Sequence, residues 1–514
     1  MDSQNQISPP VLAFKSDLPA SVVVFLVALP LCLGVALACE MPPAAGLITG
    51  IVGGIIVGCF SGSPLQVSGP AAGLTTVVVG VVLNKDLGPA ALSVIIILAG
   101  FIQILAAFAS WGRWFRAVSP AVIHGMLAGI GTLIVLGQIH AMFDVKAKST
   151  GLDNLLMLPE SFQKAFSFDS ENSHTAAAII GMATIVALFA WKSLAPGKLQ
   201  FLPAPLAALI VGTLLANLLP FATKVQKIEV PQNLFKAVIL PDSASLPFLY
   251  QKVTWISALT VALIASAETL LCAGAVDKMH SGPRTNYNKE LAAQGIGNSI
   301  CGFLGALPMT GVIVRSAANV QAGARTRCSA IFHGVWLLGL AVCFPNLLNL
   351  IPKCSLAAVL VVTGFKLVDL DQIWELRIFG RAQVVIYFVT ALTIVFSDLL
   401  VGVILGLVLS MLHLLHQFAS LRVEKTLMEG NEFRIILDGA ATFLSLPKLA
   451  ATLENLPLQT TSLQVDLQNV SFIDHACIEL LNSWRSQNES AGRKVTFEWG
   501  ESRPKYNLGS EHEL

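Results

Sequence analysis

Two short, interrupted stretches decide the fold of this chain: SGPAAGLT at residues 68–75 and MTGVIVRSAAN at residues 309–319. Each joins turn residues to a brief apolar run, a pattern typical of a helix that begins abruptly. Pro70 suits a first helical turn, because the N–H that proline lacks would have no partner there. Thr310 is the candidate cap of the second helix. We expect two half-helices that start partway through a membrane, with free N–H groups and positive dipole ends facing the midplane.

The composition around these stretches is that of a membrane protein. Among 514 residues, 54% are apolar and only 12% are charged, and the mean hydropathy is +0.72. Soluble domains carry about 25% charged residues. A net charge of +1 without a basic stripe argues against nucleic acid as a partner. Since about 20 apolar residues cross a bilayer, we predict about 14 spans, at 20–38, 46–60, 70–83, 90–109, 121–143, 176–191, 202–219, 255–272, 291–307, 311–320, 329–348, 354–365, 383–396 and 399–415.

Charge divides the chain into segments. A polar N-terminal segment (1–19) precedes an apolar body (20–420), and residues 421–514 hold 9 Lys/Arg and 13 Asp/Glu, a net charge of −4. The two short stretches hold matching places in body halves 20–220 and 250–420, which predicts a seven-plus-seven inverted repeat. The basic residues of the short loops fall mostly on one side, which predicts cytoplasmic N- and C-termini: Arg113, Arg116, Lys192, Lys198, Lys278, Arg284, Lys289, Arg325, Arg327, Arg377 and Arg381.

Two helix N-termini that converge on one point form an anion site without a metal. Arg315, one turn into the second half-helix, would add a full positive charge. The plainer alternative is that Arg315 reaches a surface or pairs with a carboxylate. Glu268 stands deep in an apolar span and has three interpretations: an ion pair with Arg315, a proton acceptor, or a sodium ligand together with Ser266 and Thr269.

Enzymatic function is not expected. The nine cysteines lie mostly in apolar runs without regular spacing, so they are interpreted as buried hydrophobes rather than as metal ligands or disulfides. The sequence contains no nucleophile–base set and no phosphate-binding loop. No cofactor is predicted beyond a possible coupling Na⁺ or H⁺.

Together, several motifs resemble the sulfate permease family (solute carrier family 26) over nearly the whole chain. They are DLPA (17–20), VALPL (27–31), SGSP (61–64), SGPA (68–71), ELAAQG (290–295) with Asn298, PMTG (308–311), RSAAN (315–319) and GART (323–326). The resemblance implies a fold like that of uracil permease, in which a core domain moves against a gate domain, and a homodimer. It also implies an anion held between the third and tenth helices, with the first and eighth beside it.

The resemblance also implies the site residues. By position they are Ala28, Leu29, Pro30, Leu31, Gly69, Pro70, Ala71, Ala72, Glu268, Val312, Ile313, Val314 and Arg315. Val314 replaces a polar residue of some relatives. Related sodium-coupled bicarbonate carriers have Asp where this chain has Glu268, which leaves the coupling ion open.

The tail resembles a STAS domain through DLQNVSFID (466–474). Related anti-sigma antagonists carry a phosphorylatable serine just after the last aspartate, where this chain has His475, Ala476 and Cys477. We therefore predict no serine phospho-switch there.

The leading hypothesis is a secondary transporter of a small inorganic oxyanion, bicarbonate or sulfate, that works by alternating access in a bacterial inner membrane. A resemblance to a bacterial branch associated with carbonic anhydrase tilts the choice slightly towards bicarbonate. Alternatives are a nucleobase permease on the same fold, an anion channel, and a membrane sensor that no longer transports.

Overall fold

The computed structural model describes residues 10–84, 86–112, 119–148, 150–167, 173–194, 202–222, 224–241, 243–397, 399–419, 421–428, 432–454 and 462–499. Residues 1–9 of the expected N-terminal segment, and the basic loop residues Arg113, Arg116 and Lys198, lie outside these ranges. The chain divides into two compact units, Met1–Gly406 and Leu407–Leu514. The helix α18 (Leu399–Ala419) crosses this boundary and is described with the first unit; each unit is otherwise described by itself.

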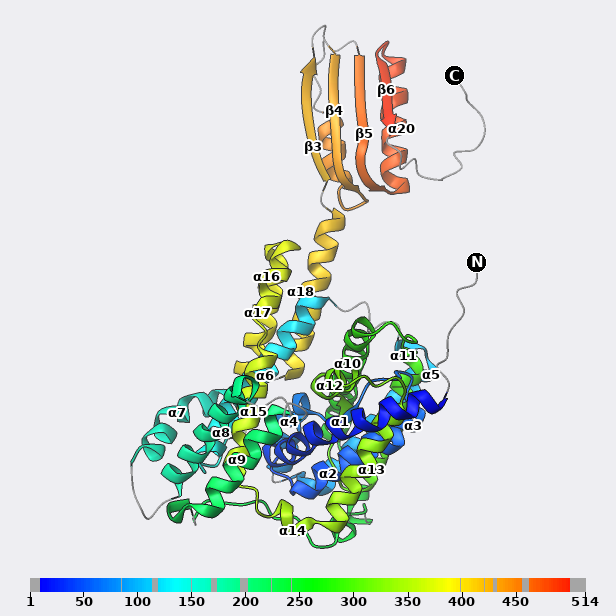
Figure 1. Cartoon of the computed structure of the whole chain (residues 1–514). Helices are drawn as coiled ribbons and strands as arrows, with labels where there is room; N and C mark the ends of the chain where they lie inside the picture. Colours follow the sequence, from blue (N-terminus) through cyan, green and yellow to red (C-terminus); the bar gives the residue numbers. More distant parts are fainter. Residues whose placement is uncertain are drawn as a thin grey trace. The chain divides into compact units, whose positions relative to one another are not determined.

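The first unit is helical (Figure 1). Its first half contains α1 (Pro10–Ala38), α2 (Pro43–Val52), η1 (Gly53–Val57), α3 (Gly58–Phe60), β1 (Ser68–Pro70), η2 (Ala72–Leu74), α4 (Thr75–Val82), α5 (Gly88–Phe108), α6 (Pro120–Met142), α7 (Gly151–Ala165), α8 (His174–Leu194) and α9 (Ala204–Leu218). The π-helical turn η1 joins α2 to α3, so these three elements form one continuous helix.

The second half repeats this order. After the short turns η5 (Pro220–Ala222), η6 (Leu234–Ala237) and η7 (Ser243–Tyr250) it contains α10 (Lys252–Met279), α11 (Tyr287–Phe303), β2 (Met309–Gly311), α12 (Ile313–Gln321), α13 (Cys328–Cys343), α14 (Pro345–Leu348), α15 (Lys353–Leu367), α16 (Asp371–Ile378), α17 (Arg381–Phe396) and α18 (Leu399–Ala419). In both halves, a three-residue strand precedes a short helix.

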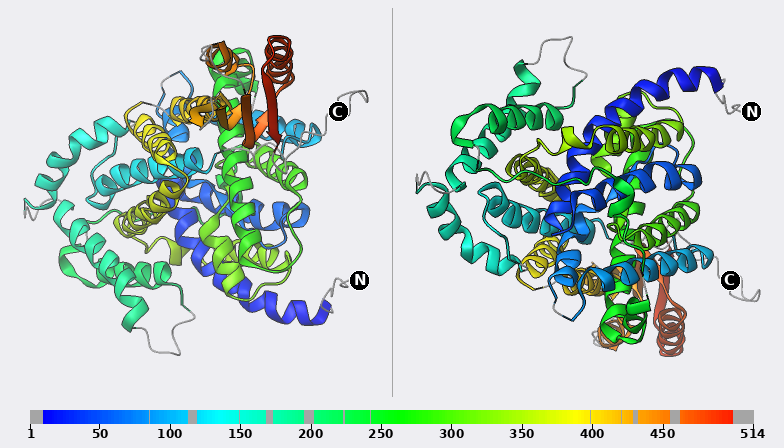
Figure 2. Two further views of the ribbon diagram at one scale, coloured as in Figure 1. Left: turned by 90° about the horizontal axis from the view of Figure 1, so that it is seen from above. Right: turned by 90° about the horizontal axis from the view of Figure 1, so that it is seen from below.

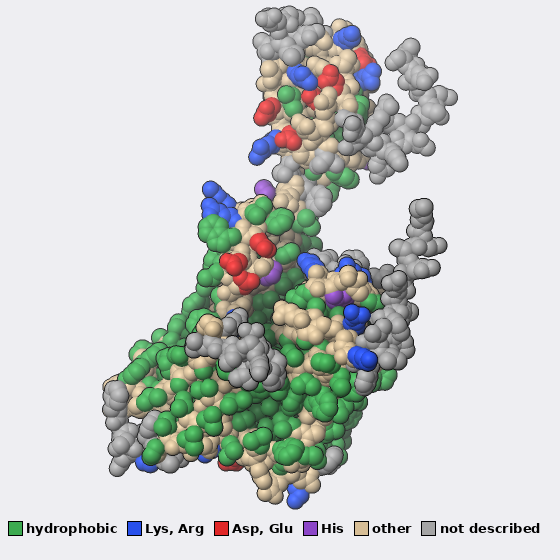
Figure 3. Space-filling model, viewed as in Figure 1, with side chains coloured by type: hydrophobic (Ala, Val, Ile, Leu, Met, Phe, Trp, Pro, Cys, Tyr) green, Lys and Arg blue, Asp and Glu red, His purple; other side chains and the backbone are tan. Residues whose placement is uncertain are grey.

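The described helices agree with a polytopic membrane protein. Seven are long and apolar enough to cross a bilayer, and four further apolar helices have 10–17 residues. Large apolar side chains point outward, such as Phe108 at 83% exposure and Phe189 at 62%. Figure 3 shows hydrophobic side chains covering most of the visible face of this unit. In water such a surface would be unfavourable, so it fits lipid as the surrounding solvent.

The two halves interleave rather than lie apart. α5 packs against α11, α1 against α13, and α6 against both α15 and α17. Two views from above and below show blue first-half helices among green second-half helices (Figure 2). At the centre β1 pairs antiparallel with β2, so that Gly69 faces Thr310 and Pro70 faces Met309. This pair of strands, Ser68–Pro70 and Met309–Gly311, is called the crossing below.

This pairing corrects two details expected from the sequence. Pro70 and Thr310 belong to the strands, not to a first helical turn and a cap. The residue before η2 is Ala71, and the residue before α12 is Val312. Strand pairing satisfies backbone groups at the crossing, which a helix starting two residues earlier would leave unpaired.

The second unit is a small α/β fold. Its four-stranded sheet has the order β3 (Leu421–Met428), β4 (Glu432–Ala441), β5 (Ser462–Ile473), β6 (Lys494–Trp499), antiparallel at β3–β4 and parallel at the other two pairs. α19 (Leu446–Glu454) and α20 (His475–Ser490) connect the parallel strands. Their apolar faces pack on the sheet, with Leu449, Leu481 and Trp484 buried beside Ile435 and Val465.

Candidate functional site

The two half-helices begin at the crossing with open N-terminal ends. Neither η2 nor α12 receives a side-chain cap. Ala71 donates its N–H to the carbonyl of Pro308 at 3.2 Å, and Val312 donates to that of Val67 at 2.9 Å. Each bond crosses from one half of the chain to the other. The N–H groups of the first helical turn that follow have no intrahelical acceptor, so both helix ends offer donors and positive potential.

A cavity of about 1280 Å³ opens at these helix ends. Eight of the predicted site residues line this cavity, and they come from α1, α10, α12 and the segments around the two paired strands. They are Leu31, Pro70, Ala72, Glu268, Val312, Ile313, Val314 and Arg315. The opposite wall comes from α6 and α15, with His124, Leu127, Leu360, Thr363 and Leu367. The lining therefore joins the crossing to a second helix group.

Arg315 is the most unusual residue of the site. Its side chain is 0% exposed, and its Nη2 donates to the thiol sulfur of Cys32 at 3.3 Å. Within the described residues, Nε and Nη1 have no hydrogen-bond partner. The guanidinium lies close over β1, because a Cβ at Gly69 would stand 2.0 Å from Nη1. A buried cation with two open donors is costly unless a ligand satisfies it.

Glu268 reaches the same crossing from α10. Its carboxyl hydrogen bonds with Thr310 in β2. It lies against η2, since a Cβ at Gly73 would stand 1.5 Å from Oε1. The described residues contain no ion pair between Glu268 and Arg315. Both charged residues therefore line the cavity without pairing directly with each other.

Seven of the predicted residues do not line the cavity, although they are neighbours in the chain of residues that do. They are Ala28, Leu29, Pro30, Gly69, Ala71, Ser266 and Thr269. Pro30 stands inside the continuous helix α1, where it cannot donate to the carbonyl four residues earlier. Ser266 accepts a hydrogen bond from Gln103 of α5 at 3.2 Å. Thr269 accepts from the N–H of Gly311 at 3.1 Å. These hydroxyls therefore contact α5 and β2 instead of sharing the open space beside Glu268.

Sequence reasoning missed the contacts that three residues make at the crossing. Cys32 follows the predicted 28–31 stretch, but it was interpreted only as a buried hydrophobe. Gly73 and Thr310 both contact Glu268. A glycine three positions beyond the predicted helix start at Pro70 was a usable signal for Gly73, because close approach of another group demands a missing side chain. The sequence offered no comparable signal for Cys32.

A family comparison places this geometry among known proteins. The model of the sulfate permease family matches residues 14–390. The chain belongs to this family. Its members are membrane transporters rather than enzymes.

The curated relatives include two bacterial proteins. The putative sulfate transporter YvdB of Bacillus subtilis is 26% identical over 97% of this chain and 96% of its own length. The bicarbonate transporter BicA of Picosynechococcus is 24% identical over 80% of this chain and 72% of its own.

Two solved structures share the fold. The murine solute carrier 26 family member A9, in its inward-facing state, has a TM-score of 0.73 at 15% identity and covers 97% of this chain and 90% of its own. The transmembrane domain of a cyanobacterial BicA has a TM-score of 0.63 at 23% identity, and covers 77% of this chain and 97% of its own.

Proposed function

We propose that this chain is a secondary transporter that carries a small inorganic oxyanion by alternating access. One observation carries the proposal: Arg315 is fully buried, its Nε and Nη1 find no partner among the described residues, and it lines a cavity at two uncapped half-helix ends. An oxyanion would accept from these donors and from the free backbone N–H groups. Two relatives, a bicarbonate transporter and a putative sulfate transporter, have names that agree with this substrate class.

The balance of charge at the crossing favours a monovalent anion. Arg315 is its basic residue and Glu268 its carboxylate. A monoanion at Arg315 with a cation at Glu268 would leave the buried site neutral, whereas a dianion such as sulfate would leave excess negative charge in a low dielectric. Asp277, Lys278 and Arg284 also line the cavity, but Asp277 and Lys278 lie nine and ten residues along α10 from Glu268, about 14 to 15 Å away. We therefore favour bicarbonate with Na⁺ or H⁺.

The same proposal includes the architecture. Counting α2–α3, η2–α4 and β2–α12 as one span each gives seven spans up to α9 and seven from α10 to α18, excluding α7, α14 and α16. Alternating access would move the group around the crossing against α6, α15 and their neighbours. The topology of the second unit supports a STAS assignment. A bacterial inner membrane, cytoplasmic termini and a homodimer remain expectations from loop charge and family resemblance.

Uptake by purified protein in liposomes tests the proposed function. Labelled bicarbonate and labelled sulfate are supplied separately, each with and without an inward sodium gradient, beside protein-free liposomes. We expect saturable bicarbonate uptake that a cation gradient accelerates. Non-saturating flux far above carrier rates would favour a channel. No uptake of either anion would favour the nucleobase or sensor alternatives.

A further inference from the structure

One face of α11 carries three buried polar residues that do not line the cavity. Glu290, Gln294 and Asn298 follow one another at four-residue spacing, which places them on one side of the helix. All three are 0% exposed. Polar groups in such positions are costly unless they are hydrogen-bonded, so their partners show what they hold. Among the described residues, only Oε1 of Gln294 lacks a partner in this set of three side chains.

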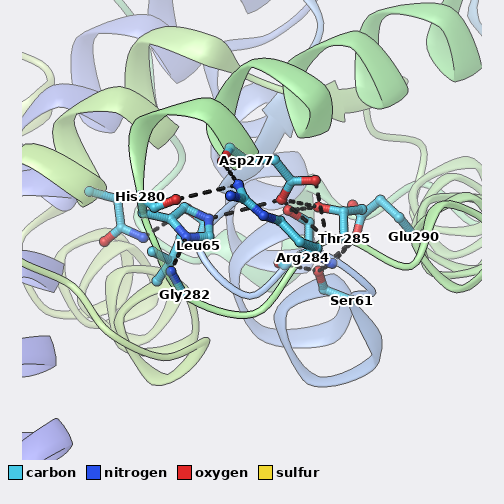
Figure 4. A network of polar contacts seen from close by, with 10 residues as sticks. Ser61, Leu65, Asp277, His280, Gly282, Arg284, Thr285 and Glu290 are labelled. Atoms are coloured by element: carbon cyan, nitrogen blue, oxygen red, sulfur yellow. Dashed lines mark hydrogen bonds and ion pairs between the residues drawn. The ribbon is translucent and has the colours of Figure 1, made fainter. Parts of the chain in front are cut away.

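Glu290 accepts five hydrogen bonds. Its Oε2 accepts from the Ser61 hydroxyl at 2.6 Å and from the N–H groups of Gly62 and Ser63 at 2.9 and 3.0 Å. Its Oε1 accepts from the Nε2 atoms of Gln66 and Gln294 at 3.2 and 3.0 Å. Figure 4 shows Glu290 beside Ser61 in this network. Five hydrogen-bond donors converge on this carboxylate, and it has no cation partner among the described residues.

Gln294 and Asn298 form hydrogen bonds with the two strands of the crossing. Gln294 donates to the hydroxyl of Ser68 in β1 at 2.5 Å. One turn further on, Asn298 accepts from the N–H of Met309 in β2 at 2.7 Å and donates to its carbonyl at 3.2 Å. A single helix face therefore contacts both strands, one from each half of the chain.

Gln66 connects Glu290 to the second strand, β2. Its amide lies so close to β2 that a Cβ at Gly311 would stand 1.8 Å from Nε2. Four residues after Gly311 comes Arg315, whose place therefore depends on how β2 is held. Glu290 thus contacts the turn before β1 directly and approaches β2 through one side chain.

We propose that Glu290, Gln294 and Asn298 are positioning residues that fix β1 against β2 and thereby aim the two half-helix ends and Arg315 at the anion. The transport readout of this inference rests on the proposed function. The three residues do not touch the anion, and Glu290 acts as a hydrogen-bonding anchor for the 61–68 segment.

The substitution Glu290→Gln keeps the size of the side chain and removes part of its capacity to accept hydrogen bonds. An amide has one acceptor oxygen, and its NH₂ would face donors on one side. If it faces Gln66 and Gln294, their amides must turn, which withdraws the Gln294 donor from Ser68. If it faces Ser61, Gly62 and Ser63, three donors lose their acceptor. Either arrangement loosens the crossing.

Amide hydrogen exchange of the protein in lipid nanodiscs measures the loosening of the crossing and does not depend on a transport assay. In Glu290→Gln we expect at least about tenfold faster exchange in peptides covering 61–72 and 305–316, with α6 and α15 unchanged. Gln294→Met should show a smaller effect confined to 61–72. The matched control is Glu160→Gln, because Glu160 lies exposed on α7, paired with Lys164. It should change nothing.

Uptake kinetics supply the second readout, with whichever of labelled bicarbonate or sulfate the wild type carries. We expect Glu290→Gln to raise KM by about tenfold while the maximal rate stays within about twofold. Unchanged exchange at both strands would overturn the proposal, and so would a uniform rise in exchange with lower maximal rate and unchanged KM. If the wild type carries neither anion, the proposed function fails, and exchange still decides the positioning role.

Discussion

At the scale of single residues, the contact between Arg315 and Cys32 is the most informative. A thiol is a weak, uncharged acceptor, so it orients the guanidinium without neutralising its charge. A carboxylate at position 32 would occupy the donors that the anion needs. The contact also shows why Arg315 can stay buried and still have two open donors.

Cys32→Asp should therefore abolish high-affinity uptake, whereas Cys32→Ser should stay close to wild type. A hydrogen bond to a charged group contributes about 1.5–3 kcal/mol, and each 1.4 kcal/mol is tenfold in affinity, so KM should rise by about tenfold or more. Concentration dependence of labelled anion uptake measures it. Equal KM values for the two variants would contradict the role given to Cys32.

Gly73 should be equally sensitive for a steric reason. The methyl group of Gly73→Ala would collide with Oε1 of Glu268 and displace the carboxylate from η2. We expect the stimulation of uptake by the cation gradient to fall at least about tenfold. Gly80→Ala is the matched control, because no atom lies within 4 Å of a Cβ there. Equal losses in both variants would contradict a coupling cation at Glu268.

The sequence predicted some of these residues and not others, for a physical reason. Arg315 and the helix-start glycines could be recognised because a charge or a break in an apolar run is a local signal. Cys32 and Thr310 acquire their roles from contacts with segments distant in the chain. No local pattern reports the thiol that faces Arg315 or the hydroxyl that faces Glu268.

At the scale of elements, bonds between the halves hold the two half-helices together. Val67 donates its N–H to Ser316, and the amide of Asn319 donates to the carbonyl of Leu65 at 2.9 Å. Thr49 in α2 both donates to and accepts from the backbone of Leu307. The strands could not be predicted from three-residue stretches, because β1 forms only where β2 is brought beside it.

Asn319→Leu tests this cross-linking. The change leaves the carbonyl of Leu65 and the hydroxyl of Ser329 without their partner, which should destabilise the unit by about 1–3 kcal/mol. A lower apparent melting temperature in detergent is the measurement. Asn217→Leu, at an exposed site on α9, removes bonds to Thr213, Leu350 and Lys227 whose partners water can satisfy instead, so it should lower the melting temperature less than Asn319→Leu. A melting temperature unchanged by Asn319→Leu would show that the cross-bond is dispensable.

At the scale of the whole molecule, the two units differ in what the sequence can reveal. The composition alone predicted a membrane body and a more charged tail, because lipid and water select different side chains. The cavity could not be predicted, since its lining joins α1 and α10 to α6 and α15, helices far apart in the chain. In the tail, Asp474 caps α20 by accepting from the N–H of Cys477 at 2.9 Å.

The tail's Cys477 should be chemically inert. Burial, with the adjacent Asp474 carboxylate, raises the pKa of its thiol to about 12, so it stays protonated near neutral pH and above. Only the thiolate reacts with alkylating reagents. Mass spectrometry after maleimide treatment of the folded full chain at pH 7 and at pH 9 should find Cys477 unlabelled at both, and labelled once denaturant is added. Labelling of Cys477 in the folded chain at neutral pH would contradict this assignment.

We propose that Arg315, with its two donors unpaired among the described residues, holds the transported anion. The decisive experiment compares initial rates of labelled bicarbonate and sulfate uptake in liposomes for the wild type, Arg315→Ala, Arg315→Lys and a control, Arg327→Ala, whose side chain makes an exposed contact. We expect at least about hundredfold loss for Arg315→Ala, partial retention for Arg315→Lys, and wild-type rates for Arg327→Ala. Uptake by Arg315→Ala with the KM and rate of the wild type would contradict it.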